Sequence, residues 1–334
     1  MTNKEKVILG LVAIVAIAGV ALASSGVLPI NNKNTTNAFV QNMLKAKQNV
    51  TSVHLDVAVN GSIEDGAHGQ GGQFALKGSG IVSKAGEHDS ADIHITLSGA
   101  EAGSQDMAAE MDLRVLDRVL YLRPTRIPPL PFIEPSQIMN KWFSLDPIEM
   151  YKQFGNSDKA AELENTLNAG TRMPAEFYEK AYALTIDTGL VSKLNKKGSE
   201  VVSGVPAEKY EMTLNMQKLP DFLAKYADLY NSYAPTAGLE PMPVKNFTDD
   251  DKEALNALKI SPISFWVGKD DYLVYKTSFS MSFDDSGATS VGQNSKGTVT
   301  FEITASDYNK EVTVEKPEKA MPIQQFFQSL MSQN

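Results

Sequence analysis

The sequence predicts an α+β fold in which a large antiparallel sheet carries several helices against one face. Three observations predict it. Apolar and polar residues alternate with a period of two in many short segments, helical apolar patterns occur before, between and after these segments, and no linker divides them into independent groups. We therefore expect one domain at residues 37–320, followed by a C-terminal helix at residues 321–334.

An apolar segment lies close to the N-terminus. Residues 7–23 contain no charged side chain, and Lys4 and Lys6 precede them. The length is at the short end of what a helix needs to cross a bilayer. The basic flank predicts a cytoplasmic N-terminus at residues 1–6. We therefore expect one transmembrane helix at residues 7–24.

The segment after this helix is expected outside the cytoplasm. Residues 25–36 are predicted to form a linker to a domain held at the cell membrane by a single-pass anchor. The alternative is a signal peptide cleaved after Ala23, because residues 21–23 read Ala-Leu-Ala. The protein would then be secreted, and the domain would still be extracytoplasmic.

The first half of the predicted domain begins with a helix near Asn37–Val50, where apolar residues recur at helical spacing. The spacing then changes to a period of two, which predicts half-buried strands with one apolar and one polar face. These strands are expected at residues 53–59, 73–83, 93–97, 107–115 and 119–123.

The middle of the chain interrupts this pattern. Pro124–Pro135 contains five prolines, and proline cannot donate a ladder hydrogen bond, so we expect an extended crossover. A short strand is expected at residues 141–145, and two or three helices are expected within residues 146–182.

The second half repeats the strand pattern. Helices are predicted at residues 219–230, 248–258 and 322–331. Strands are predicted at residues 210–214, 263–267, 273–283 and 299–305, with Val312 and Val314 continuing the last of them.

Composition excludes several kinds of function. The chain has no cysteine, which excludes disulfides, a thiol nucleophile and a lipidated cysteine. The whole chain has a net charge of −9, and residues 1–24 contribute +1 through two Lys and one Glu. The remainder therefore has a net charge of −10. This charge argues against nucleic-acid binding and against attraction to anionic lipid by electrostatics alone. No sequence signature of a hydrolase, nucleotide-binding loop or zinc protease occurs, so we expect neither an enzyme nor a cofactor.

Two histidine–aspartate pairs provide a candidate metal site, for which a plain polar strand surface is the alternative. His54 and Asp56 share one strand face, as do Asp92 and His94. Two imidazoles and two carboxylates would gather a metal if the two strands were neighbours. Alternation alone also places polar groups on the solvent face, and we therefore predict no metal.

The apolar strand faces provide the candidate binding site. Such a face usually packs against its own helices, but it can also leave a cavity for an acyl chain. Methionine fills irregular spaces and tolerates varied partners. On alternation alone, the predicted cavity-lining residues are Met107, Met111, Leu113, Phe279, Met281 and Phe301.

Four segments together resemble a known family. They are Asn140–Asp146 (NKWFSLD), Val202–Leu214 (VSGVPAEKYEMTL), Phe265–Tyr275 (FWVGKDDYLVY) and Val299–Pro317. Their order resembles the LolA/LppX-type (LolA-like, LppX/LprG-like) lipoprotein-carrier superfamily, although a lipobox cysteine is missing. The resemblance covers residues 37–318 and implies a large curved antiparallel sheet, a half-barrel, with helices packed against its concave face around an apolar cavity.

The resemblance also assigns structural roles to single residues. Gly204 and Pro206 would make a turn, Tyr210 would enter the sheet, Trp266 would begin a hairpin, and Pro317 would end the last strand. It implies binding of a lipid or acyl chain outside the cytoplasm, with an envelope protein as a further partner that the sequence does not identify. The alternative is a cell-surface interaction or sensor module with a filled core and no small ligand.

Overall fold

The computed structural model describes residues 35–65, 70–84, 89–101, 107–129, 134–153, 155–168, 173–237, 239, 241–243, 247–248, 255, 257–284 and 295–331. The predicted membrane segment and its linker lie outside these residues. Among the helices of the described part, none combines the length and the apolar character that a membrane span requires.

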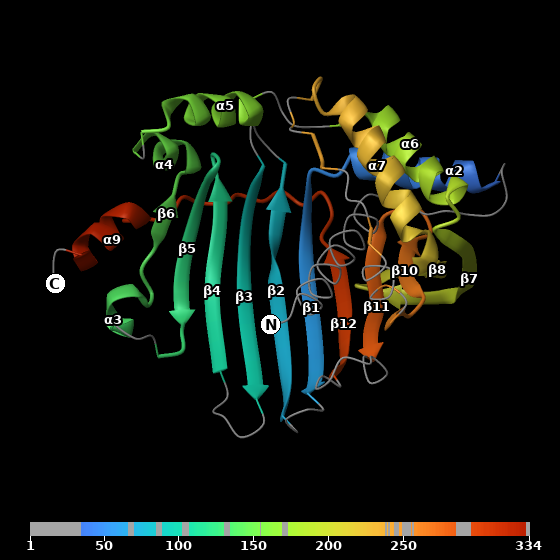
Figure 1. Ribbon diagram of the computed structural model, residues 1–334, viewed down its shortest axis with the longest axis horizontal. Coiled ribbons are helices and arrows are strands. Elements are labelled where there is room, and N and C mark those ends of the chain that lie inside the picture. Colours follow the sequence, from blue (N-terminus) through green and yellow to red (C-terminus); the bar gives the residue numbers. More distant parts are fainter. Residues whose placement is uncertain are drawn as a thin grey trace. The chain divides into compact units, whose positions relative to one another are not determined.

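The described residues form an α+β fold with an open, mostly antiparallel sheet (Figure 1). The helices are α2 (Thr35–Gln48), α3 (Pro135–Ile138), α4 (Pro147–Gln153), α5 (Ser157–Asn168), α6 (Ala175–Asp187), η1 (Met216–Lys218), α7 (Leu219–Tyr233) and α9 (Ile323–Met331). The strands are β1 (Ser52–Asp65), β2 (Gln70–Ser83), β3 (Ser90–Glu101), β4 (Met107–Leu116), β5 (Val119–Arg126), β6 (Phe143–Leu145), β7 (Val191–Val202), β8 (Val205–Leu214), β9 (Leu258–Ile260), β10 (Ile263–Gly268), β11 (Val274–Asp284), β12 (Ser295–Ser306) and β13 (Met321–Pro322).

The chain divides into two compact units. One, called here the β1–β6 unit, comprises residues 50–60, 72–169 and 305–334. The other, called the β7–β12 unit, comprises the residues up to Asn49 together with 61–71 and 170–304. Each unit contains its own part of the sheet and its own buried residues, so each is described separately.

The β1–β6 unit is a meander extended by one parallel strand. Its strands follow the order β1-β2-β3-β4-β5-β6-β13, and β13 pairs with β6 in parallel. Phe143 of β6 packs edge-to-face on Phe326 of α9, with ring centroids 5.1 Å apart. Ile138 of α3 joins them, and together they form the buried cluster at the β6 end of this unit.

The β7–β12 unit has the strand order β12-β11-β10-β8-β7, with β9 paired to β11. The turn between β7 and β8 contains Gly204 at φ +79°, a left-handed conformation that glycine adopts without strain. This confirms the turn predicted there, although Pro206 already lies within β8. Tyr210 and Trp266 lie in β8 and β10, as expected, and the hairpin after Trp266 leads into β11.

Several elements differ from the prediction. The segment with Val312 and Val314 is not a strand, and Pro317 therefore ends none. The reason is that apolar spacing reports burial, and Val314 is buried without belonging to a ladder. Strand β7 was not predicted at all. Of the helix predicted at residues 248–258, residues 255 and 257 are helical, Leu258 already begins β9, and most of the remainder lies outside the described residues.

Residues 307–320, called here the C-terminal strap, cross the sheet of the β1–β6 unit from β1 to β6 (red in Figure 1). At the first end, the Asn309 amide donates to the Ser52 carbonyl at 2.9 Å, and the Asn309 side chain accepts from the Thr51 amide at 2.8 Å. Next to the other end, the Met321 amide donates to the Trp142 carbonyl at 2.9 Å. The strap thus satisfies its backbone through scattered contacts rather than through strand pairing.

Candidate functional site

The apolar face of β2, β3 and β4 is the candidate site. Strand register places apolar residues of the three strands side by side in rows across this face. From one end of the strands to the other, the rows are Phe74–Gly99–Met107, Leu76–Leu97–Ala109, Gly78–Ile95–Met111, Gly80–Ile93–Leu113 and Val82–Ala91–Val115. β5 extends the last three rows with Pro124, Leu122 and Leu120.

Every row contains a glycine or an alanine. Three of these small residues are glycines, at positions 78, 80 and 99. A Cβ at Gly78 would meet the Val57 side chain and the His94 carbonyl, both at ordinary contact distance. Gly80 is different, because a Cβ there would collide with the backbone of Asp92. Small residues therefore reduce the side-chain volume on this face, and at Gly80 they also allow close strand approach.

Exposure increases along these rows. Ala91 is buried, Met111 and Leu113 are half-buried, Leu97 is 46% exposed, and Met107 is 63% exposed. A single exposed apolar side chain is ordinary, but exposed apolar side chains in two neighbouring rows form a patch, which is less common. The face is thus apolar along its length and incompletely covered at the Leu97 and Met107 end.

Three of the six predicted cavity residues lie on this face. Met107, Met111 and Leu113 project from the same side of β4, since their spacing is even and the pairing of β4 with β3 is unbroken from Met107 to Val115. The register shift opposite Glu110 and Met111 leaves out Thr125 of the neighbouring β5. Leu97 and Phe74 share the face and were not among the predicted residues. The β3 alternation could have indicated Leu97, but only the register places it beside Ala109 and Leu76.

The other three predicted residues belong to the β7–β12 unit, where they are buried. Phe279 and Phe301 are register partners on β11 and β12, and their rings stack with centroids 4.7 Å apart. Met281 follows Phe279 on the same face and is almost fully buried. These side chains are part of a packed core.

Aromatic side chains fill the same core further along. Tyr210 stacks on Phe265 at 5.8 Å, and Phe39 of α2 packs on Tyr210 at 4.9 Å. The Tyr210 hydroxyl donates to Glu208 at 2.7 Å. Burial and this hydrogen bond raise the pKa of Tyr210. The Tyr210 hydroxyl is therefore a hydrogen-bonded group of the core, and its contacts point to a structural role.

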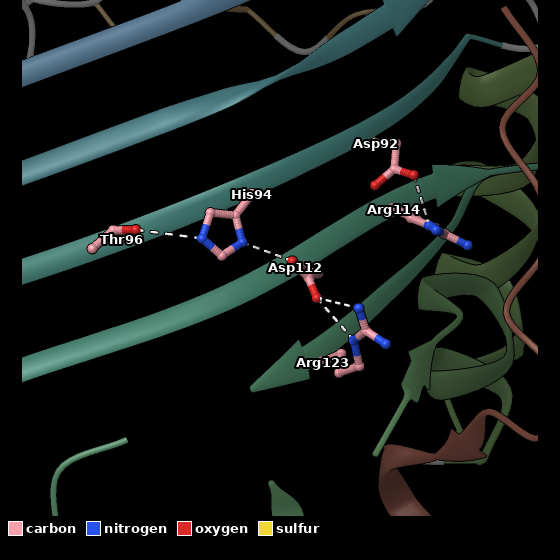
Figure 2. Close-up of polar contacts among 6 residues, drawn as sticks. All are labelled: Asp92, His94, Thr96, Asp112, Arg114 and Arg123. Atoms are coloured by element: carbon pink, nitrogen blue, oxygen red, sulfur yellow. Dashed lines mark hydrogen bonds and ion pairs between the residues drawn. The ribbon is translucent and has the colours of Figure 1, made fainter. Parts of the chain in front are cut away.

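The opposite, polar face of β3, β4 and β5 carries a network of paired charges (Figure 2). The Asp112 carboxylate accepts from His94 Nδ1 at 2.8 Å and from Arg123 Nε at 2.8 Å. Thr96 lies 3.4 Å from the other ring nitrogen of His94. Burial raises the pKa of Asp112, but the hydrogen bonds from His94 and Arg123 outweigh it and hold that pKa below its usual value.

Arg114 links this network to the strap. Its Nε lies 2.9 Å from the Asp92 carboxylate, and its Nη1 donates to the Glu315 carbonyl at 3.0 Å. Two guanidinium groups contact the Trp142 ring, with Arg114 at 5.0 Å and Arg123 at 4.8 Å from its centroid. The polar groups thus pair with each other and with the strap, which is a structural role.

The structure does not bring the two histidine–aspartate pairs together. β2 lies between β1 and β3, and His94 contacts Asp112 while Asp92 contacts Arg114. Within the described ranges, no group of three or more metal-binding side chains converges. The metal hypothesis therefore has no geometric support in that part of the chain.

A serine, a histidine and an aspartate do meet on β1 and β2. Ser79 Oγ donates to Asp56 at 2.6 Å, and His54 Nε2 lies 3.2 Å from Ser79 and 3.4 Å from Asp56. In a catalytic triad the histidine stands between the other two and uses both ring nitrogens. Here the serine proton goes directly to the carboxylate and one ring nitrogen contacts both partners, so the cluster does not have triad geometry.

Comparison with known proteins gives structural neighbours only. No protein-family model and no curated protein matches the chain. It is similar to the crystal structure of the Mycobacterium tuberculosis lipoprotein LppX, at 14% identity and a TM-score of 0.33, over 83% of this chain and 97% of LppX. It is also similar to LprF from Mycobacterium bovis, at 15% identity and a TM-score of 0.35, over 84% of this chain and 96% of LprF.

A third similar structure is a DUF1329 family protein from Desulfovibrio piger. Its identity is 12% and its TM-score is 0.20, over 84% of this chain and 94% of that protein. The descriptions of these three structures name no catalytic activity.

Proposed function

We propose that this chain is a membrane-anchored, extracytoplasmic binding protein for a lipid or acylated ligand. The observation that carries the proposal is the incompletely covered apolar face of β2–β4, where Met111 and Leu113 are half-buried and Met107 is exposed. The N-terminal apolar segment at residues 7–24 is the proposed anchor. The proposal includes the half-barrel curvature of the sheet, with helices against its concave face, that the family resemblance implies.

An acyl chain matches this face in chemistry. The five rows on β2, β3 and β4 consist of aliphatic side chains, methionine, one phenylalanine and small residues, and none of their members is charged. Burying one methylene is worth about 0.8 kcal/mol, so ten methylenes correspond to roughly 8 kcal/mol, or about micromolar affinity before ordering costs. Apolar burial therefore supplies the main driving force for binding, and a polar group would add selectivity.

Native mass spectrometry tests this function. The protein is exported, purified without denaturation, and its bound lipid is extracted and identified. We expect a stoichiometric acyl species in the native chain and its loss in Met111→Glu, because a carboxylate at the centre of the face would be desolvated by the acyl chain.

The matched control is Val201→Glu. Val201 is 69% exposed on β7 and belongs to the other unit. This variant should retain its lipid. A native chain that carries no lipid, even after incubation with membrane lipids, would contradict the proposal and favour a protein-interaction module.

A further inference from the structure

One end of the candidate face exposes more apolar surface to solvent than ligand binding alone requires. Leu97 and Met107 are 46% and 63% exposed, and they lie on adjacent rows at the same end of β3 and β4. Phe74 lies in the same row as Met107, separated from it by Gly99. The apolar surface is thus most exposed at one end, called here the β2–β4 tip.

We propose that the β2–β4 tip inserts into the interface of a lipid bilayer and is the end at which an acyl chain enters the site. This inference rests on the proposed function. The tip is continuous with the apolar face, because the Leu76–Leu97–Ala109 row joins it to the row containing Met111. A chain leaving the bilayer at the tip would remain in contact with apolar side chains throughout, which avoids exposing its methylenes to water.

The charged residues near the tip indicate which kind of lipid surface it contacts. The described strand ends 72–77, 96–101 and 107–110 contain Lys77, Glu101 and Glu110, which is one base against two acids. Attraction to anionic headgroups requires a cluster of basic residues. The tip lacks one, and the chain beyond residue 24 carries −10. Contact must therefore come from apolar insertion, and a neutral phosphatidylcholine surface suffices.

The proposed anchor keeps the protein near such a surface. Only residues 25–34 separate the proposed anchor from α2. A peptide of this length spans at most about 35 Å, since each residue adds about 3.5 Å when fully extended. An anchored domain therefore stays close to its own bilayer, which raises the effective concentration of that surface for the domain.

The absence of cysteine from the chain makes a direct test available. The full chain is prepared with a single cysteine, as Leu97→Cys, Met107→Cys or, as the exposed apolar control, Val201→Cys. Each variant is labelled with an environment-sensitive fluorophore and reconstituted into phosphatidylcholine vesicles. We expect blue-shifted emission, and quenching by lipids with a spin label on the acyl chain, at positions 97 and 107 but not at 201.

A second set of vesicles and a second background separate the alternatives. Adding anionic phosphatidylglycerol should not increase quenching, and a strict requirement for it would overturn apolar insertion. The same labels are then placed in the Met111→Glu background, which removes the proposed ligand site. Quenching that persists there supports insertion whether or not the ligand hypothesis holds. Quenching that disappears comes from bound ligand and would overturn the inference, as would equal signals at all three positions.

Discussion

The β1–β6 and β7–β12 units share one arrangement and differ in another. In each, a tryptophan ring contacts two cations: Trp142 contacts Arg114 and Arg123, and Trp266 contacts Lys209 and Lys276 at 4.9 and 5.4 Å. Their apolar faces differ, because aromatic rings fill one while the other has small residues in every row and stays partly exposed.

This difference separates structural roles from binding roles. Phe279 and Phe301 stack on each other and are buried, and their burial contributes to stability. Met111 and Leu113 are less covered, and their apolar surface remains available. Substitutions in the two units should therefore change different quantities: unfolding free energy in one and ligand occupancy in the other.

The largest expected effect is the loss of stability in Phe279→Ala. The Phe279 side chain is 5% exposed, and removing its ring should cost about 3–5 kcal/mol of unfolding free energy. Leu113→Ala, on the half-open face, should cost only about 1–2 kcal/mol, since less of its surface is buried. Urea unfolding followed by circular dichroism measures both, and equal losses would remove the distinction between the two faces.

The next largest loss of unfolding free energy is expected from disrupting the polar network around Asp112. Asp112→Asn should destabilise the protein by about 1–3 kcal/mol at neutral pH, because His94 and Arg123 lose their charged acceptor. The pKa of Asp112 is held below its ordinary value, so its stabilising contribution is fully present above about pH 4. That contribution is lost as the pH falls through the lowered pKa.

Acid titration of stability tests this assignment. Thermal unfolding is measured from pH 7 down to pH 2 for the native chain and for Asp112→Asn. The difference between them should shrink at the acid end of the series. A difference that stays constant over the whole range would show that Asp112 is not the titrating group.

A smaller effect is expected for Arg114→Ala at the strap. The variant loses the hydrogen bond to the Glu315 carbonyl and the contact with Trp142, together about 1–2 kcal/mol. Limited proteolysis should cut residues 307–320 faster. Arg126→Ala is the matched control, because its ion pair to Glu110 is 3.7 Å long and exposed and is worth about 0–1 kcal/mol. Equal cleavage in both variants would show that Arg114 does not hold the strap.

The smallest effect on stability is expected for Met107→Ala. A side chain that is 63% exposed buries little surface, so the unfolding free energy should change by no more than about 0.5 kcal/mol. A shift in Tm of several degrees would show that Met107 is packed in solution, and the tip would then not be open.

Alternation predicted which residues share a strand face but not whether that face is covered. Met111 and Met281 occupy equivalent positions in similar patterns, yet only Met281 is fully buried. Coverage depends on distant segments such as α2, whose Phe39 packs on Tyr210, and local spacing contains no information about such contacts.

Strand adjacency was the second property that spacing could not supply. His54 with Asp56, and Asp92 with His94, have spacing suitable for a shared site, but β2 separates their strands. The strap shows the same limit, because Val312 and Val314 alternate as in a strand although no strand pairs with them. Most of the longer helices and strands lie close to their predicted positions because periodicity is a local property, but the largely polar strand β7 was not predicted.

Photo-crosslinking tests the central claim most directly. The native chain is incubated with a fatty acid that carries a diazirine on its acyl chain, irradiated, digested and mapped by mass spectrometry. We expect adducts on peptides from β2, β3 and β4, including Met111, and their loss when unlabelled fatty acid competes. Adducts confined to β8, β10, β11 and β12, around Phe279 and Phe301, would contradict the assignment of the binding face, and so would labelling that no competitor reduces.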